Sequence, residues 1–305
     1  MPGLLAGIGT WIADRWLQTV VLSGMLWVAT LVVAARLGQS HPFDAARLHT
    51  WLDEIASQRA GHSPAAILLA VAAALLTAGA AGLAAGALGA LHQRLWGADG
   101  SGPVLAWLPR WRRRWWQRRY SERARRAVAD ALAADLAEPR DPVLATARKA
   151  RAERALRLRA EREPHRPTRI GDTLHAVAVR LRARYDLDLD LAWPRLWAVL
   201  DETLRADLAG ARAAYDSAAR LAGWSVLYTA LTVLWWPAAL IGAGVFVTAV
   251  ARARGAAAVL ASLVEAAVDL RLTELADQLG VRPDTGELTE LGQAVGRRLG
   301  RPTRS

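Results

Sequence analysis

The chain has 305 residues, 53% of them hydrophobic, and carries a formal net charge of +11 at pH 7. It contains no cysteine, which excludes disulfides, thiolate nucleophiles, iron–sulfur clusters and cysteine-ligated zinc. The hydrophobic residues gather in long blocks instead of recurring at helix or strand spacing, a pattern typical of membrane-spanning segments. We therefore expect an all-α integral membrane protein.

The N-terminal part predicts a transmembrane helical hairpin over residues 16–91. Its two spans, 16–35 and 65–91, each hold roughly twenty or more uncharged residues, which at 1.5 Å per residue cross a hydrocarbon core of about 30 Å. Residues 1–15 have apolar side chains at helical spacing and suit an interfacial segment. An alternative treats the first 35 residues as a cleaved signal peptide, because Val33-Ala34-Ala35 resembles a cleavage site.

The distribution of arginine predicts the orientation of this hairpin. A dense arginine run follows the second span, whereas the loop at 37–64 carries about as many acids as bases. The positive-inside bias then places the run and the N-terminus in the cytoplasm and the loop outside; with a second hairpin the C-terminus is cytoplasmic as well.

The external loop allows two interpretations. His41, His49 and His62 share it with three acids, Asp44, Asp53 and Glu54, which a metal ion could use as ligands. An interfacial amphipathic helix is favoured instead, because apolar residues recur on one helical face at Leu48, Trp51, Leu52 and Ile55. We expect no metal site.

Residues 92–166 are predicted to form a basic cytoplasmic helical segment. Tryptophan seats at the headgroup level of a bilayer and arginine attracts anionic lipid, so we expect this segment to contact lipid headgroups. Charge that only sets topology is an equal alternative, and nucleic acid is disfavoured because the segment is tethered to the bilayer. The residues predicted to make the contact are Trp107, Trp111, Arg112, Arg113, Arg114, Trp115, Arg118 and Arg119.

Residues 167–220 are predicted to form a second cytoplasmic helical segment that leads into the membrane. Thr168 can cap a helix whose apolar residues recur from Ile170 to Leu181. We expect Trp193-Pro194 to start a further helix, with an interruption near Asp201. The three acids between these helices, Asp186, Asp188 and Asp190, favour a solvated linker whose leucines dock on the bundle over a cation site.

Residues 221–251 form a third apolar stretch, and we interpret it as a second transmembrane hairpin. Trp235-Trp236-Pro237 suits a tight turn at the far leaflet, because tryptophan favours the interface and proline suits a first helical position. A single crossing is the alternative, and it would place the basic C-terminal tail outside. Residues 252–305 are predicted to form cytoplasmic amphipathic helices, the last from Leu288 to Leu299, followed by a basic tail.

Several local motifs between residues 167 and 300 resemble a family of uncharacterised membrane proteins common in actinobacteria. They are Pro167-Thr168-Arg169-Ile170-Gly171-Asp172, Arg184-Tyr185-Asp186-Leu187-Asp188, Trp193-Pro194-Arg195-Leu196 and, after the apolar hairpin, Leu263-Val264-Glu265-Ala266-Ala267. Relatives more often have Gly-Asn at the Gly171-Asp172 position. The resemblance implies a multi-pass architecture in a bacterial plasma membrane and carries no activity with it.

The sequence lacks the common catalytic motifs and offers a packing motif instead. There is no phosphate-binding loop, no His-Glu-x-x-His pair and no Gly-x-Ser-x-Gly elbow. The second span has small residues four apart, which lets helix backbones approach closely, at Ala78, Gly82, Gly86 and Ala90.

These features predict a membrane-anchored helical scaffold or regulator that recruits a cytoplasmic protein partner. No enzyme activity and no cofactor are expected. The alternative is an oligomeric effector or pore assembled through the small-residue face. The scaffold or regulator is favoured over the pore because the spans have few polar residues to line a pore.

Overall fold

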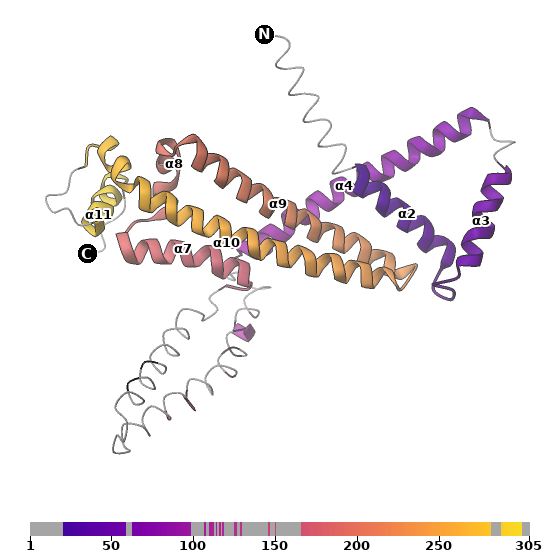
Figure 1. Ribbon diagram of the computed structural model, residues 1–305, viewed down its shortest axis with the longest axis horizontal. Helices are drawn as coiled ribbons and strands as arrows, with labels where there is room; N and C mark the ends of the chain where they lie inside the picture. The colour runs from indigo at the N-terminus through magenta and orange to yellow at the C-terminus, as the bar shows by residue number, and fades with distance from the viewer. Residues whose placement is uncertain are drawn as a thin grey trace, which may run out of the picture. The chain divides into compact units, whose positions relative to one another are not determined.

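The computed structural model describes residues 21–58, 63–98, 166–281 and 288–300, together with single positions between 107 and 150. All regular structure in these parts is helical, as the sequence predicts (Figure 1). The helices are α2 (Leu22–Leu37), α3 (Ala45–Gln58), α4 (Pro64–Gly97), α7 (Arg169–Tyr185), α8 (Leu189–Val199), α9 (Glu202–Ala230), the 3-10 helix η3 (Leu231–Val233), α10 (Ala238–Gln278) and α11 (Leu288–Arg298).

Short polar side chains begin several of these helices by accepting a backbone N–H of the first turn. Thr168 Oγ1 accepts the Gly171 N–H at 3.0 Å at the start of α7, which confirms the predicted cap. An Asp201 carboxylate oxygen accepts the Leu204 N–H at 2.7 Å. Helix α9 starts directly after this aspartate, at Glu202. The predicted interruption near Asp201 is therefore confirmed, and its cause is a cap.

The chain divides into two compact units. Unit 1 comprises residues 1–93 and 210–256, and unit 2 comprises residues 94–209 and 257–305. The long helices α4, α9 and α10 each contribute residues to both units. The two units thus join parts of the chain that the sequence analysis treats as six consecutive segments.

Among the described helices, α4 and α10 are long and apolar enough to cross a membrane. Only 17% of the most apolar stretch of α4 is buried within the protein. Its first four turns carry large apolar side chains on the surface, among them Leu68, Leu69 and Leu76. The described part of the first predicted span, α2, is a shorter apolar helix.

Close backbone contacts at small residues hold unit 1 together. A side chain at Gly24 of α2 would overlap the carbonyl of Ala78 on α4, and one at Gly223 of α9 would overlap the carbonyl of Ala85. Gly89 approaches α9 in the same way, at Ala219. The seam along α4 therefore runs through Ala78, Ala81, Ala85 and Gly89, because these positions recur at three and four residues on one helical face.

The third apolar stretch contains a reversal of the chain. The end of α9 passes through η3 and the turn at Trp235-Trp236-Pro237 into α10, and the two helices run side by side (Figure 1). Close packing follows the turn, since a side chain at Gly242 of α10 would overlap the hydroxyl of Thr229 on α9. A cluster of Tyr228, Leu231 and Ala238 fills the space next to the turn.

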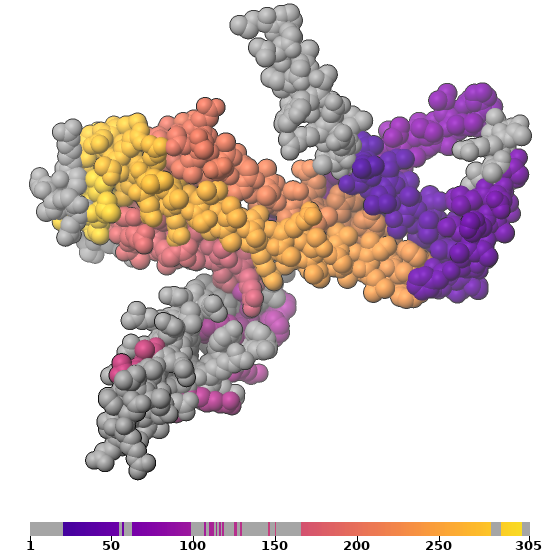
Figure 2. All heavy atoms as spheres, viewed as in Figure 1, coloured from indigo at the N-terminus to yellow at the C-terminus, as the bar shows by residue number. Residues whose placement is uncertain are grey.

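Unit 2 has its own hydrophobic core, built from α7, α8, α11 and parts of α9 and α10. Helices α7, α8 and α11 pack against one another, and the C-terminal part of α10 lies beside them in the space-filling view (Figure 2). At the C-terminal end of α7, α11 lies so close that a side chain at Gly292 would overlap the carbonyl of Tyr185. The largest fully buried side chains of this core are Leu181, Leu187, Leu196, Leu200, Leu272, Leu275, Val268 and Val295.

The start of α8 differs from the prediction. This helix begins at Leu189, and Pro194 lies inside it, so the expectation that Trp193-Pro194 starts a helix is wrong. Asp188 caps α8 by accepting the Asp190 N–H at 3.2 Å, which begins the helix five residues earlier. Burial of Ala192 and Leu196 in the core of unit 2 stabilises this longer helix despite the proline.

Candidate functional site

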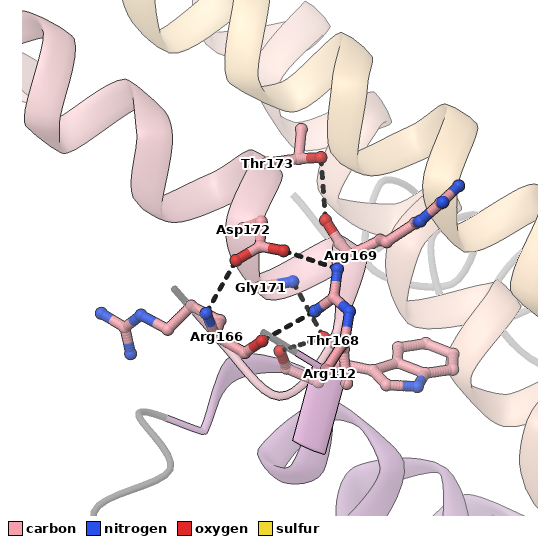
Figure 3. A network of polar contacts seen from close by, with 8 residues as sticks. Arg112, Arg166, Thr168, Arg169, Gly171, Asp172 and Thr173 are labelled. Atoms are coloured by element: carbon pink, nitrogen blue, oxygen red, sulfur yellow. Dashed lines mark hydrogen bonds and ion pairs between the residues drawn. The ribbon is translucent and has the colours of Figure 1, made fainter. Parts of the chain in front are cut away.

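The guanidinium of Arg112 joins two distant parts of unit 2. One terminal nitrogen donates to an Asp172 carboxylate oxygen at 2.7 Å and the other to the Arg166 carbonyl at 2.7 Å. The second Asp172 oxygen accepts the Arg166 N–H, also at 2.7 Å (Figure 3). Charge-assisted hydrogen bonds of this kind are roughly twice as strong as neutral ones. Arg112 therefore fastens the basic segment to the start of α7.

The same turn is fastened to the end of α4. The Thr168 hydroxyl donates to the Trp96 carbonyl at 2.8 Å while it accepts the Gly171 N–H. A Cβ at Gly171 would lie 2.5 Å from the Trp96 carbonyl oxygen, so only glycine fits at this approach. The turn at 166–172, labelled in Figure 3, thus connects three parts of unit 2: the basic segment, α4 and α7.

The basic segment shows two faces at its described positions. Trp107 and Trp111, one helical turn apart, are each 59% exposed. Arg110 and Arg114 are exposed on the same side, whereas Trp116 is buried beside the anchoring Arg112. We call Trp107, Arg110, Trp111 and Arg114 the Trp–Arg face. This face presents aromatic and cationic groups together, the combination that suits the headgroup layer of an anionic bilayer.

Among the predicted headgroup residues that the structure describes, Arg112 differs from the rest. Arg112 points to Asp172 and serves as an anchor, whereas Trp107, Trp111, Arg114 and Arg118 are exposed. Arg113, Trp115 and Arg119 lie outside the described residues.

The predicted packing ladder on α4 is divided between two sides of the helix. Ala78 and Gly82 are buried, and Ala78 lies on the seam of unit 1. A side chain at Gly86 would meet nothing within 4 Å, and Ala90 is exposed. Among the described residues, Gly86 and Ala90 therefore lie outside the backbone seam formed by Ala78, Ala81, Ala85 and Gly89.

The remaining motif residues occupy structural positions in unit 2. The Tyr185 hydroxyl donates to Asp269 on α10 at 2.6 Å. Burial raises the pKa of Tyr185, and the bond to Asp269 raises it further. Trp193 lies 6.1 Å from Trp197, centroid to centroid, and Arg195 donates to the Leu191 carbonyl at 2.9 Å.

The acidic residues considered as ligands also have local structural contacts. Asp186 ends α7 in the left-handed conformation, Asp188 caps α8, and Asp44 accepts the Arg47 N–H at 3.1 Å in α3. His62 lies outside the described residues. Within the parts of the chain that the structure describes, no group of three or more His, Asp or Glu side chains could hold a metal ion.

A groove of about 400 Å³ lies between α7 and α10, lined by Arg180, Arg184, Glu265 and Asp269. Arg180 pairs with Glu265, and Arg184 pairs with Asp269 at 3.3 Å. Because each charge lining the groove has a partner of opposite sign, the groove has no net preference for an anion or a cation.

No protein-family model matches the chain, and neither the curated proteins nor the solved structures contain a match to it.

Sequence reasoning found the Thr168 cap but missed the Arg112 anchor. The cap is visible as a threonine three residues before Gly171, a local pattern. Arg112 and Asp172 are 60 positions apart in the chain, and the sequence contains many arginines that could have paired with this aspartate. Asp172 is an acidic residue in the first turn of α7, and nothing in the sequence around it singles out Arg112 as its partner.

Proposed function

We propose that the protein is a helical scaffold of the bacterial plasma membrane. Unit 1 is embedded in the bilayer, both termini are cytoplasmic, and unit 2 is held at the cytoplasmic surface, where it recruits a protein partner. The Trp–Arg face rests on anionic headgroups. No catalytic residue and no cofactor are part of this proposal.

The exposed apolar surface of α4 is the observation that carries the proposal. The helix is uncharged from Pro64 to Leu91, and only 17% of its most apolar stretch is buried by the described residues of the protein. Soluble monomers rarely expose continuous apolar patches larger than a few hundred Å². Lipid is the solvent that suits such a helix, and the α-helix satisfies its own backbone groups there.

The charge distribution supports the orientation. Arg94 follows the apolar part of α4, and Arg252 and Arg254 follow the apolar part of α10. The positive-inside bias places these ends, and the arginine-rich segment that follows α4, in the cytoplasm.

The surface of unit 2 supports partner recruitment. On α10, Leu270 is 71% exposed, and Val259 is exposed on the same side of the helix together with uncharged Ser262. Exposed apolar side chains along one side of a helix are typical of surfaces that bind other proteins. We assign the contact with the partner to this face of α10.

Site-specific photocrosslinking in cells of the source organism tests recruitment. A photoreactive residue in place of Leu270 should give a discrete crosslinked band, because the side chain reaches into the interface. The matched control is Asp207 on α9, which is exposed and polar and should give none. If neither Leu270 nor Val259 yields a band that depends on irradiation, the scaffold function is wrong.

A pore is the second candidate function, and one observation favours it. Among the described residues, nothing lies within 4 Å of a side chain added at Gly86, and Ala90 is exposed, so this side of α4 has room for a second copy of the chain. An oligomer built through this side of α4 would be able to enclose a path across the membrane.

A further inference from the structure

The apolar arms of the α9–α10 hairpin are short for a bilayer. Arg220 precedes the uncharged stretch and Arg252 follows it, with the turn at Trp235-Trp236-Pro237 between them. Each arm therefore has roughly 14 uncharged residues and a length of about 21 Å. The hydrocarbon core of a typical bilayer is about 30 Å thick. The arms fall short of this thickness by about a third.

The turn between the arms carries apolar side chains on its surface. Val233 is 82% exposed and Phe43, from the neighbouring loop, is 72% exposed. The rings of Phe43 and Trp236 meet edge to face with centroids 5.8 Å apart. These side chains suit a position at or below the headgroups, where aromatic residues are enriched.

Gln39 and Pro42 satisfy the polar backbone of this turn. The Gln39 amide nitrogen donates to the carbonyls of Thr232 at 2.6 Å and Val233 at 3.0 Å, and its oxygen accepts the Trp236 N–H at 3.2 Å. The Trp235 indole donates to the Pro42 carbonyl at 2.9 Å. Backbone groups left without partners are costly next to lipid, so these bonds adapt an irregular turn to the boundary between the headgroups and the hydrocarbon core.

Polar residues of unit 1 mark the level of this turn. The Arg36 guanidinium lies 4.8 Å from the ring centroid of Trp51, and Asp44 caps α3 next to the loop that holds Gln39. At the opposite end of the arms, Arg220 and Arg252 are exposed. Polar residues thus lie at both ends of the arms, near the turn and at Arg220 and Arg252, and the apolar part of unit 1 between them has the length of the arms.

We infer that unit 1 fits a bilayer with a hydrocarbon core nearer to 21 Å than to 30 Å, and that it thins a bilayer of ordinary thickness around the α9–α10 hairpin. The lipid partner is therefore a membrane with short or disordered acyl chains. This inference rests on the proposed membrane embedding. The uncharged run of α4 is about 42 Å long; tilting within the usual range of membrane helices shortens its span only in part, and the rest of the run extends into the headgroup layer.

Reconstitution of the full chain into vesicles of different thickness tests the inference. The vesicles contain phosphatidylcholine and phosphatidylglycerol with myristoleoyl, oleoyl or erucoyl chains, in increasing order of thickness. We expect the melting temperature to be highest in myristoleoyl lipid and to fall in each thicker one. A maximum in oleoyl or erucoyl lipid overturns the inference.

A matched variant checks that arm length is the cause. Replacing Arg220 and Arg252 together by leucine lengthens the apolar arms and should move the optimum toward oleoyl lipid, because the charges that limit the arms are gone. Replacing Arg182 of unit 2 by leucine removes a charge elsewhere and should leave the optimum unchanged. If the Arg220/Arg252 variant keeps the optimum of the wild type, the inference is wrong.

A separate readout reports on the proposed function. Val226 lies in the middle of an arm and is partly exposed. A bimane label on Val226→Cys should be quenched by lipids brominated in their acyl chains and shielded from aqueous iodide in all three bilayers. Iodide quenching in all three would show that the hairpin is not embedded, whatever the order of melting temperatures.

Discussion

Replacing Gly223 by isoleucine should disrupt unit 1, whereas the same replacement at Gly86 should leave its fold intact. At Gly223 the new side chain would overlap the carbonyl of Ala85, which belongs to the backbone of α4 and cannot move aside alone. At Gly86 it would enter open space. We expect a loss of stability of about 3 kcal/mol or more for Gly223→Ile, the upper end of overpacking costs. For Gly86→Ile we expect no loss.

Thermal unfolding in detergent and the oligomeric state by light scattering check this prediction. The two variants also distinguish the scaffold function from the pore function. In a scaffold, Gly86→Ile changes neither stability nor oligomeric state, and wild-type protein in liposomes conducts no ions. Wild-type conductance by a defined oligomer that Gly86→Ile dissolves would establish the pore instead. If Gly223→Ile is as stable as the wild type, the close packing of α4 against α9 is wrong.

Neutralising two arginines of the Trp–Arg face should release it from anionic headgroups. Each arginine near a charged surface contributes about 1 kcal/mol, so Arg110→Gln with Arg114→Gln should weaken the contact by about 2 kcal/mol, or roughly thirty-fold. Arg112 stays in place, and with it the anchor to Asp172. Added salt should weaken the contact of the unmodified face, because exposed charges are screened.

The contact can be measured on the full chain in nanodiscs. A fluorophore on Trp107→Cys reports quenching by a nitroxide on lipid headgroups, with and without phosphatidylglycerol. The control variant carries Arg297→Gln and Arg298→Gln, which remove the same charge from α11. Quenching that is independent of phosphatidylglycerol, salt and the two Trp–Arg face arginines would show that these charges do not bind lipid.

Local sequence patterns predicted much of the fold. The apolar recurrence from Ile170 to Leu181 and the Thr168 cap predicted α7, and the recurrence from Leu288 to Leu299 predicted α11. Each depends on contacts within a few turns of one helix, which is the information that periodicity and capping carry.

Positions that depend on distant partners were harder to predict. The chain is rich in alanine and glycine, so small residues occur on several sides of α4, and the sequence does not reveal which side packs on α9. In the structure, Ala85 and Gly89 form the contact of α4 with α9, and Gly86 lies outside this contact. The Arg112–Asp172 pair and the capping of the hairpin turn by Gln39 likewise join residues far apart in the chain.

The most direct test of membrane embedding is the accessibility of single cysteines to a membrane-impermeant maleimide in cells, for which this cysteine-free chain is well suited. Three exposed positions serve: Ser57 on α3, Leu76 on α4 and Gln293 on α11. We predict labelling of Ser57 in intact cells, of Gln293 only after permeabilisation, and of Leu76 in neither state, since a thiol surrounded by lipid does not ionise. Labelling at position 76 would contradict the embedding of α4 in the bilayer, and labelling at position 293 from outside would contradict a cytoplasmic C-terminus.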